Sequence, residues 1–161
     1  MKDFETSDVT DLLVGITSAY LNTFLQRQLY GITASVREGK VRETRRLFSQ
    51  ADVYGIALVW MLFESGLRTQ AIRRILNDLA GTKKAAARTT AELLRKAEAE
   101  YIVVVREPRK PKGKTEPEPN ITTAKKGDLP RIVSNNPTAS VLLIPVGQKF
   151  EDVRKRIEIL L

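Results

Sequence analysis

The sequence predicts a mainly α-helical fold with a small amount of β-structure, arranged as a helical head at residues 6–80 and a small α+β module at residues 81–161. Three observations predict this arrangement. Apolar residues recur at helical spacing along most of the first half. Residues 31–48 lack that spacing and hold glycines together with Lys and Arg. The second half alternates helix-forming stretches with short β-branched runs.

Two short helices open the head. Residues 7–13 place apolar side chains on one helical face, and Gly15 ends that helix. A second helix, capped by Thr17 or Ser18, is predicted to run to about Tyr30. Short helices joined by a turn of this kind form a helix-turn-helix pattern.

Residues 31–48 predict a short β-hairpin with an exposed tip. Gly31 and Gly39 suit turns, and most of the positive charge of the head lies between Arg37 and Arg46. Over the whole head the Lys and Arg residues are nearly balanced by Asp and Glu, so this charge is a local patch. Such a patch favours a polyanionic partner, and a solvated basic loop is the alternative.

A long buried helix and an amphipathic helix complete the head. Ser49 is placed to cap a helix from Gln50 to about Glu64, with Asp52 at its third helical position. This helix is apolar on almost all sides, which is typical of a buried helix. Gly66 breaks it, and a further helix spans residues 69–79, with Thr69 as its predicted cap.

The second module is predicted as a helix, two or three strands and a closing helix. The helices are expected at Lys83–Glu100 and Phe150–Leu161, and strands at Tyr101–Val105 and Ala139–Val146. Residues 107–128 hold four prolines and mixed charge, so they are predicted to form a flexible loop. A module this small buries little apolar surface alone, and self-association would remedy that.

Composition excludes several classes of chemistry. The chain has a net charge of +8 and contains no cysteine and no histidine. That removes disulfides, thiol catalysis, Cys/His zinc sites and the Ser-His-Asp triad. We expect neither an enzyme nor a protein that holds a cofactor or metal. No apolar run is long enough to cross a membrane or to act as a signal peptide, so we expect a cytoplasmic protein.

Particular motifs in the head resemble those of one family. They are Gly15-Ile16-Thr17 before the second helix, Leu21 and Phe24 within it, Arg46-Leu47-Phe48-Ser49 at the end of the hairpin, Asp52-Val53 in the third helix, Phe63-Glu64-Ser65-Gly66-Leu67 at its end, and Ala71-Ile72-Arg73-Arg74-Ile75-Leu76 in the fourth. Their order and spacing resemble the winged helix-turn-helix DNA-binding head of MerR-type transcription regulators over residues 6–80. The resemblance implies a dimer that binds near-palindromic double-stranded DNA, with the hairpin as the wing.

The second helix and the hairpin supply side chains suited to DNA. Short polar side chains at the start of a helix can reach base edges in the major groove, and basic side chains neutralise phosphates. Asn22 stands where the family usually has Arg, and Arg27 or the wing could replace that phosphate contact. An ordinary solvent-facing helix surface is the alternative for Asn22 and Thr23. The predicted DNA-binding residues are Thr17, Ser18, Ala19, Tyr20, Asn22, Thr23 and Arg27 on the helix, and Lys40, Arg42, Arg45 and Arg46 on the hairpin.

Other notable residues receive structural interpretations. The aromatic residues of the head are expected to fill the core, with Tyr20 as the one that also faces the groove; they are Tyr20, Phe24, Phe48, Trp60 and Phe63. The basic residues of the proline-rich loop are expected to be solvated, with contact to the DNA backbone as the alternative; they are Arg109, Lys110, Lys112 and Lys114.

The sequence therefore predicts a dimeric, nucleoid-associated, sequence-specific DNA-binding transcriptional regulator of MerR-like type. It identifies no effector ligand. One alternative is an architectural or accessory DNA-binding protein, such as an excisionase-like or segregation factor. A second alternative is a protein-interaction adaptor whose winged helix does not bind DNA.

Overall fold

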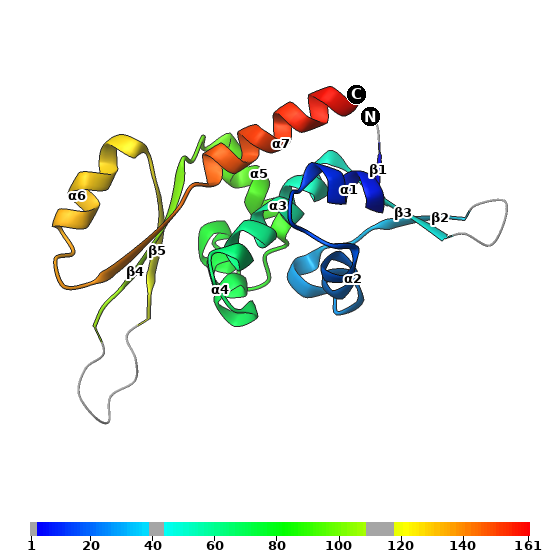
Figure 1. The fold of residues 1–161 in the computed structure, drawn as a ribbon. Coiled ribbons are helices and arrows are strands. Elements are labelled where there is room, and N and C mark those ends of the chain that lie inside the picture. The colour runs from blue at the N-terminus through cyan, green and yellow to red at the C-terminus, as the bar shows by residue number, and fades with distance from the viewer. Residues whose placement is uncertain (1–2, 39–43, 109–117) are drawn as a thin grey trace.

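The computed structural model describes residues 3–38, 44–108 and 118–161. These described residues form an α+β fold with seven α-helices and two three-stranded antiparallel sheets. Figure 1 shows most of the helices between the two sheets, with α6 on the outer side of the second sheet. The mixture of helix and sheet agrees with the predicted class.

The first half contains the first sheet, with strand order β1-β3-β2, and four helices. Its elements in chain order are β1 (Phe4–Glu5), α1 (Thr6–Leu12), α2 (Ser18–Gln26), the 3₁₀ helix η1 (Leu29–Gly31), β2 (Ser35–Glu38), β3 (Thr44–Phe48), α3 (Gln50–Glu64) and α4 (Thr69–Ala80). The predicted antiparallel hairpin is confirmed, with Ser35 opposite Leu47 and Glu38 opposite Thr44.

The second half contains the second sheet, with strand order β5-β4-β6, and three helices. Its elements are α5 (Ala87–Lys96), β4 (Tyr101–Arg106), β5 (Asn120–Ala124), the 3₁₀ helix η2 (Lys126–Asp128), α6 (Leu129–Ser134), β6 (Ser140–Ile144) and α7 (Val146–Leu160). None of the helices in the described part of the chain combines the length and apolar character that a membrane crossing requires.

The central helix α3 forms as its sequence predicts. The backbone N–H of Asp52 donates to the Ser49 hydroxyl at 3.2 Å, and the Ser49 N–H donates to the Asp52 carboxylate at 2.9 Å. This reciprocal pair is a capping box, which satisfies two backbone donors that the first turn leaves free. The residues from Val53 to Leu62 are all buried, as expected of a helix that is apolar on all sides.

The prediction that the second helix runs to Tyr30 is wrong, because α2 ends at Gln26. Gln28 and Tyr30 have positive φ angles of 46° and 63°, which turn the chain out of the helix. The turn brings the Tyr30 ring into edge contact with Phe24, with ring centroids 5.6 Å apart. Tertiary packing of Tyr30 therefore overrides its helical spacing.

The prediction of a helix from Lys83 to Glu100 is too long at both ends. The backbone N–H of Ala85 donates to the Asn77 side chain at 2.9 Å, which holds the chain in a turn before α5 begins. At the other end Glu98 has a φ of 49°, and Ala99 N–H donates to the Leu94 carbonyl at 3.0 Å. This is a Schellman ending in which glutamate takes the position that glycine usually occupies.

The prediction that residues 107–128 form a loop without secondary structure is wrong for the described part of that segment. Asn120–Ala124 forms β5, which pairs with β4 so that Ile121 lies opposite Val104. Prolines and charges dominate the segment and obscured this short β-branched run. Residues 109–117, with Arg109, Lys110, Lys112 and Lys114, lie outside the described residues.

One hydrophobic core spans both halves of the chain. The α3 and α5 backbones approach so closely at Gly55 that a Cβ added there would lie 2.6 Å from the backbone nitrogen of Arg88. On the second sheet, Ile102, Val104 and Ile144 join this core. The opposite face of that sheet forms a smaller apolar cluster that includes Leu129 and Ile132 at α6.

Candidate nucleic-acid interface

Helix α2 is fixed by its apolar side and exposes its polar side. Leu21 and Phe24 are buried, whereas Ser18 and Ala19 are exposed. The Thr17 hydroxyl accepts a hydrogen bond from the Tyr20 N–H at 3.3 Å, so Thr17 caps the helix as predicted. The start of α2 therefore presents small side chains to solvent.

The turn before α2 is held by the end of α3. The indole Nε1–H of Trp60 donates to the Val14 carbonyl at 3.3 Å. Gly15 has a φ of 91°, and a Cβ there would lie 3.6 Å from the Trp60 ring. Trp60 thus links the orientation of the α1–α2 turn to the most buried helix of the protein.

The β2–β3 hairpin is tied to α2 by one polar contact. The Arg46 guanidinium on β3 donates to the side-chain oxygen of Asn22 on α2. The contact joins residues that are distant in sequence and sets the hairpin beside the outer side of α2 (Figure 1). In the free protein, the Asn22 side-chain oxygen therefore accepts from Arg46, and the Asn22 amide N–H₂ group can still donate to other partners.

Arg45 makes a contact that the sequence did not indicate. Its guanidinium lies 2.9 Å from the carboxylate of Glu5, and both side chains are largely exposed. Glu5 belongs to β1, which pairs with the far edge of β3. Only this pairing of strands distant in sequence brings the two residues together, so no local pattern could have predicted the contact.

Like Asn22, two further predicted contact residues on α2 have intramolecular partners. The Thr23 hydroxyl donates to the Ala19 carbonyl at 2.9 Å. The Tyr20 ring packs against Trp60 and Phe63, with ring centroids 5.4 and 5.5 Å apart. Tyr20 nevertheless remains 43% exposed, so it belongs partly to the core and partly to the surface.

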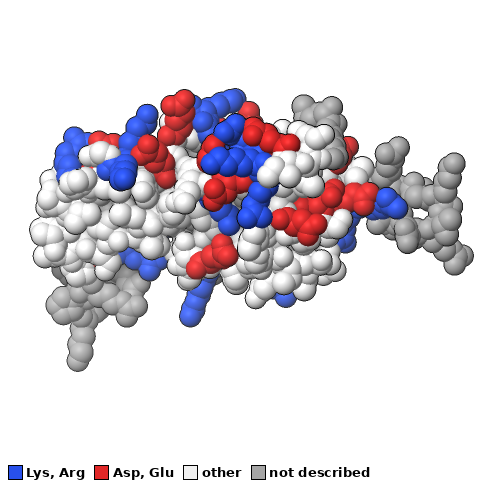
Figure 2. Space-filling model, turned by 45° about the horizontal axis from the view of Figure 1, so that its top comes forward, with Lys and Arg blue, Asp and Glu red and all other residues white. Residues whose placement is uncertain are grey.

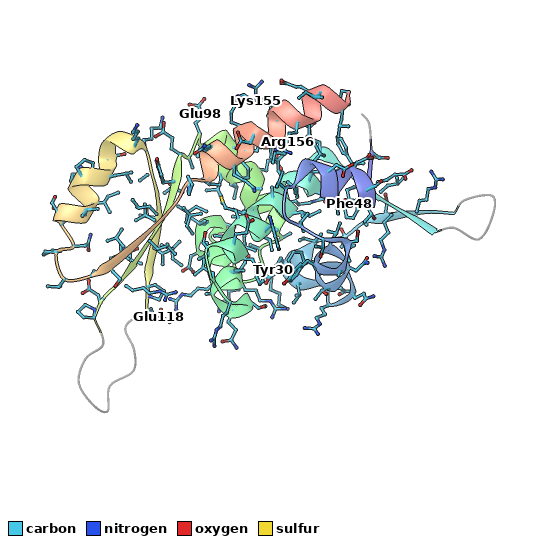
Figure 3. All side chains as sticks on the ribbon, viewed as in Figure 1. Tyr30, Phe48, Glu98, Glu118, Lys155 and Arg156 are labelled. Carbon is cyan, nitrogen blue, oxygen red and sulfur yellow. The ribbon has the colours of Figure 1, made fainter. Side chains whose placement is uncertain are left out.

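The expected aromatic core is confirmed for Phe24, Phe48 and Trp60, which are buried. Figure 3 shows Phe48 at the base of the hairpin, where it packs the strands onto the helices. Phe63 belongs to the core only in part: its ring stacks on Trp60, with centroids 5.5 Å apart, but 39% of its surface is exposed. It lies at the last turn of α3, where the helix emerges from the core.

The predicted DNA-binding residues fall into three groups. On α2 and β3, Asn22 and Arg46 are in direct contact, whereas Arg45 pairs with Glu5 on β1. Arg27 caps the opposite end of α2 and is exposed, about 15 Å from Thr17 along the helix axis. Lys40 and Arg42 lie outside the described residues.

The surface around α7 has a different electrostatic character. Figure 2 shows Lys and Arg interspersed with Asp and Glu on that face. Arg154 binds Glu151 at 2.6 Å and Glu158 at 2.8 Å, and its hydrogen bond lowers the pKa of the Glu151 carboxyl. Neighbouring opposite charges cancel at a distance, so this face attracts a polyanion less than an uncompensated patch would.

Comparison with known proteins adds no assignment. The sequence matches no protein-family model and no curated protein.

Proposed function

We propose that this protein is a dimeric, sequence-specific DNA-binding transcriptional regulator of MerR-like type. In this proposal α1 and α2 form the helix-turn-helix, the β2–β3 hairpin is the wing, and α2 enters the major groove. Ser18, Ala19, Asn22 and Thr23 would face base edges. Arg45 and Arg46, with Lys40 and Arg42, would neutralise phosphates.

The observation that carries the proposal is the contact between Arg46 and Asn22. It couples a basic strand to the exposed side of a helix that begins with small side chains. A duplex needs such a pairing, because base edges and flanking phosphates lie side by side along the groove. On binding, Arg46 could exchange Asn22 for a phosphate, which would free the Asn22 oxygen to accept from adenine N6.

The proposal includes a dimer because apolar side chains at the C-terminal end of α7 are exposed to solvent. Ile159 is 83% exposed and Leu161 is 72% exposed. Contact between two copies at this end would remove these side chains from water. Two linked heads would then bind two half-sites, and the preferred DNA would be a near-palindrome.

The decisive experiment measures binding of the full chain to random duplex DNA by fluorescence anisotropy over a salt series. Wild type is compared with Arg45→Ala/Arg46→Ala. We expect the slope of log K against log salt to flatten by about two units, one for each lost phosphate contact. The matched control is Arg131→Ala/Lys155→Ala, which removes the same charge from exposed positions on α6 and α7 and should keep the wild-type slope.

Sequence selection on the bound DNA separates the possible roles. A near-palindrome among the selected sequences supports a dimeric regulator. A steep salt slope without any enriched sequence points to an architectural DNA-binding protein instead. Absence of binding at low salt, with folded protein, rules out both DNA-binding roles.

One observation favours the protein-interaction adaptor as the second candidate. Val14 is 60% exposed, and its carbonyl accepts a hydrogen bond from Trp60, whose ring packs against the partly exposed rings of Tyr20 and Phe63. Exposed apolar patches commonly mark protein contacts. In that case Tyr20→Ser would abolish partner binding, and the arginine substitutions on the hairpin would leave it unchanged.

A further inference from the structure

A pocket lies between α3, α5, the start of β4 and α7, away from the candidate nucleic-acid interface. Its volume is 320 Å³, within the size range of roughly 300–1,000 Å³ typical of small-molecule sites. Leu94, Ala99 and Phe150 supply apolar wall, and charged side chains from α5 and α7 line its remaining sides. The pocket suits a small molecule and is too small for a folded partner.

Tyr54 on α3 lines this pocket and has an unusual hydroxyl group. The residue is 1% exposed, and its hydroxyl has no hydrogen-bond partner. The Arg95 guanidinium lies 3.7 Å from the ring centroid, and Phe150 contacts the ring edge-on at 5.6 Å. A buried hydroxyl without a partner is costly, so its retention points to a group that binds it in another state.

Most of the charges around the pocket already have partners. Glu151 binds Arg154 through two hydrogen bonds, at 2.6 and 2.9 Å. Glu100 accepts a hydrogen bond from the backbone N–H of Lys126. These groups are held in place by the protein and are not available as primary ligands.

Two charged groups in the pocket are not paired in this way. Within the described residues, neither Arg95 nor Glu98 forms an ion pair, although the Arg95 charge contributes to the lowered pKa of Glu92. The Glu98 backbone adopts the left-handed conformation, with a φ of 49°, in the Schellman motif that ends α5. Glu98 is exposed and lines the pocket, and Figure 3 shows this residue near the start of α7.

We propose that this pocket binds a small zwitterion of the amino-acid type. The ligand carboxylate is bound by the Arg95 guanidinium and the Tyr54 hydroxyl, which gives that hydroxyl its missing partner. The ligand ammonium group is bound by the Glu98 carboxylate. The ligand side chain lies against Leu94, Ala99 and Phe150. A guanidinium and a carboxylate that form no ion pair within the described residues, together with an apolar wall, favour this class of ligand.

The first test titrates the full chain, without DNA, with each of the twenty common amino acids by isothermal titration calorimetry. We expect at least one to bind with 1:1 stoichiometry. Its N-acetyl derivative removes the positive charge and its carboxamide removes the negative charge, so each should bind at least tenfold more weakly. Equal binding of either derivative would overturn the assignment of that charge, and binding by none of the twenty would overturn the proposal.

The second test separates ligand binding from structural roles of the same residues. Tyr54→Phe keeps the ring and its contacts with Arg95 and Phe150 but removes the unpaired hydroxyl. We expect its ligand-free melting temperature to equal or exceed that of wild type, while its affinity for the amino acid falls at least tenfold. Glu98→Gln should weaken binding of the amino acid but leave binding of its N-acetyl derivative unchanged.

Tyr30→Phe is the matched control, because Tyr30 is a buried tyrosine that Figure 3 shows well away from Glu98. It should bind the amino acid like wild type. Wild-type affinity in Tyr54→Phe would overturn the role of the hydroxyl. Since all these titrations omit DNA, their outcome is independent of whether the protein binds DNA.

Discussion

At the residue scale, polar contacts between distant segments decide how the candidate interface is built. The cap at Thr17 follows from local sequence spacing, and the helical period places Asn22 on the outward side of α2. The Arg46–Asn22 and Arg45–Glu5 contacts follow only from the folded chain. They fix which basic side chains lie beside α2 and which are shared with an acidic neighbour.

Two helices end in the same way with different residues, which allows a paired prediction. Gly81 after α4 and Glu98 after α5 both have positive φ angles, 66° and 49°. Only glycine adopts this conformation without a steric cost. Glu98→Gly is therefore expected to raise the free energy of unfolding by about 1 kcal/mol, and Gly81→Ala to lower it by about the same amount.

Both variants are measured by urea denaturation monitored by circular dichroism. A Cβ at Gly81 has no atom within 4 Å, so the loss there would come from backbone conformation alone. If Glu98→Gly lowers the free energy of unfolding, the Glu98 side chain stabilises the fold through a contact that outweighs its backbone strain.

At the element scale, the sequence predicted helices well where caps and periodicity agreed. The α3 bounds follow from Ser49, Asp52 and an apolar run that has no competing signal. The end of α2 could not be predicted, because Tyr30 keeps helical spacing while its ring is drawn onto Phe24. β5 was missed because the prolines and charges around it obscured its short β-branched run, and its pairing with β4 could not be read from the local sequence.

The contact between α3 and α5 carries a sharp prediction. A Cβ at Gly55 would lie 2.6 Å from the backbone nitrogen of Arg88 and 2.9 Å from its Cα. These backbone atoms can move only if α5 moves with them. Gly55→Ala should therefore push α5 away from α3 and destabilise the protein by about 1–3 kcal/mol, although alanine favours helices.

Gly127→Ala is the control for that change, because no atom lies within 4 Å of its added Cβ. Its midpoint in thermal unfolding should stay close to that of wild type. A Gly55→Ala protein as stable as wild type would show that α3 and α5 are further apart in solution than in this fold.

At the scale of the whole molecule, the head and the second module share their interior. Tyr54 on α3 contacts Phe150 on α7, and the buried Thr90 hydroxyl on α5 donates to the Leu76 carbonyl on α4 at 3.2 Å. The sequence suggested that the small second module gains burial by self-association. Packing onto α3 already supplies much of that burial within one chain.

This shared core predicts that residues 1–80 do not fold cooperatively alone. Without α5 and α7, the sides of α3 around Tyr54 and Gly55 would face water, and the apolar surface they bury would be lost. We expect the 1–80 fragment to lack a cooperative thermal transition in near-ultraviolet circular dichroism. The full chain should unfold in one transition, and Val104→Ala in the second sheet should shift that whole transition to lower temperature. A fragment that melts cooperatively within a few degrees of the full chain would contradict the shared core. It would also mean that the head folds without the pocket beside Tyr54. An unfolded fragment would instead mean that a ligand which stabilises α3 against α5 and α7 also stabilises the head.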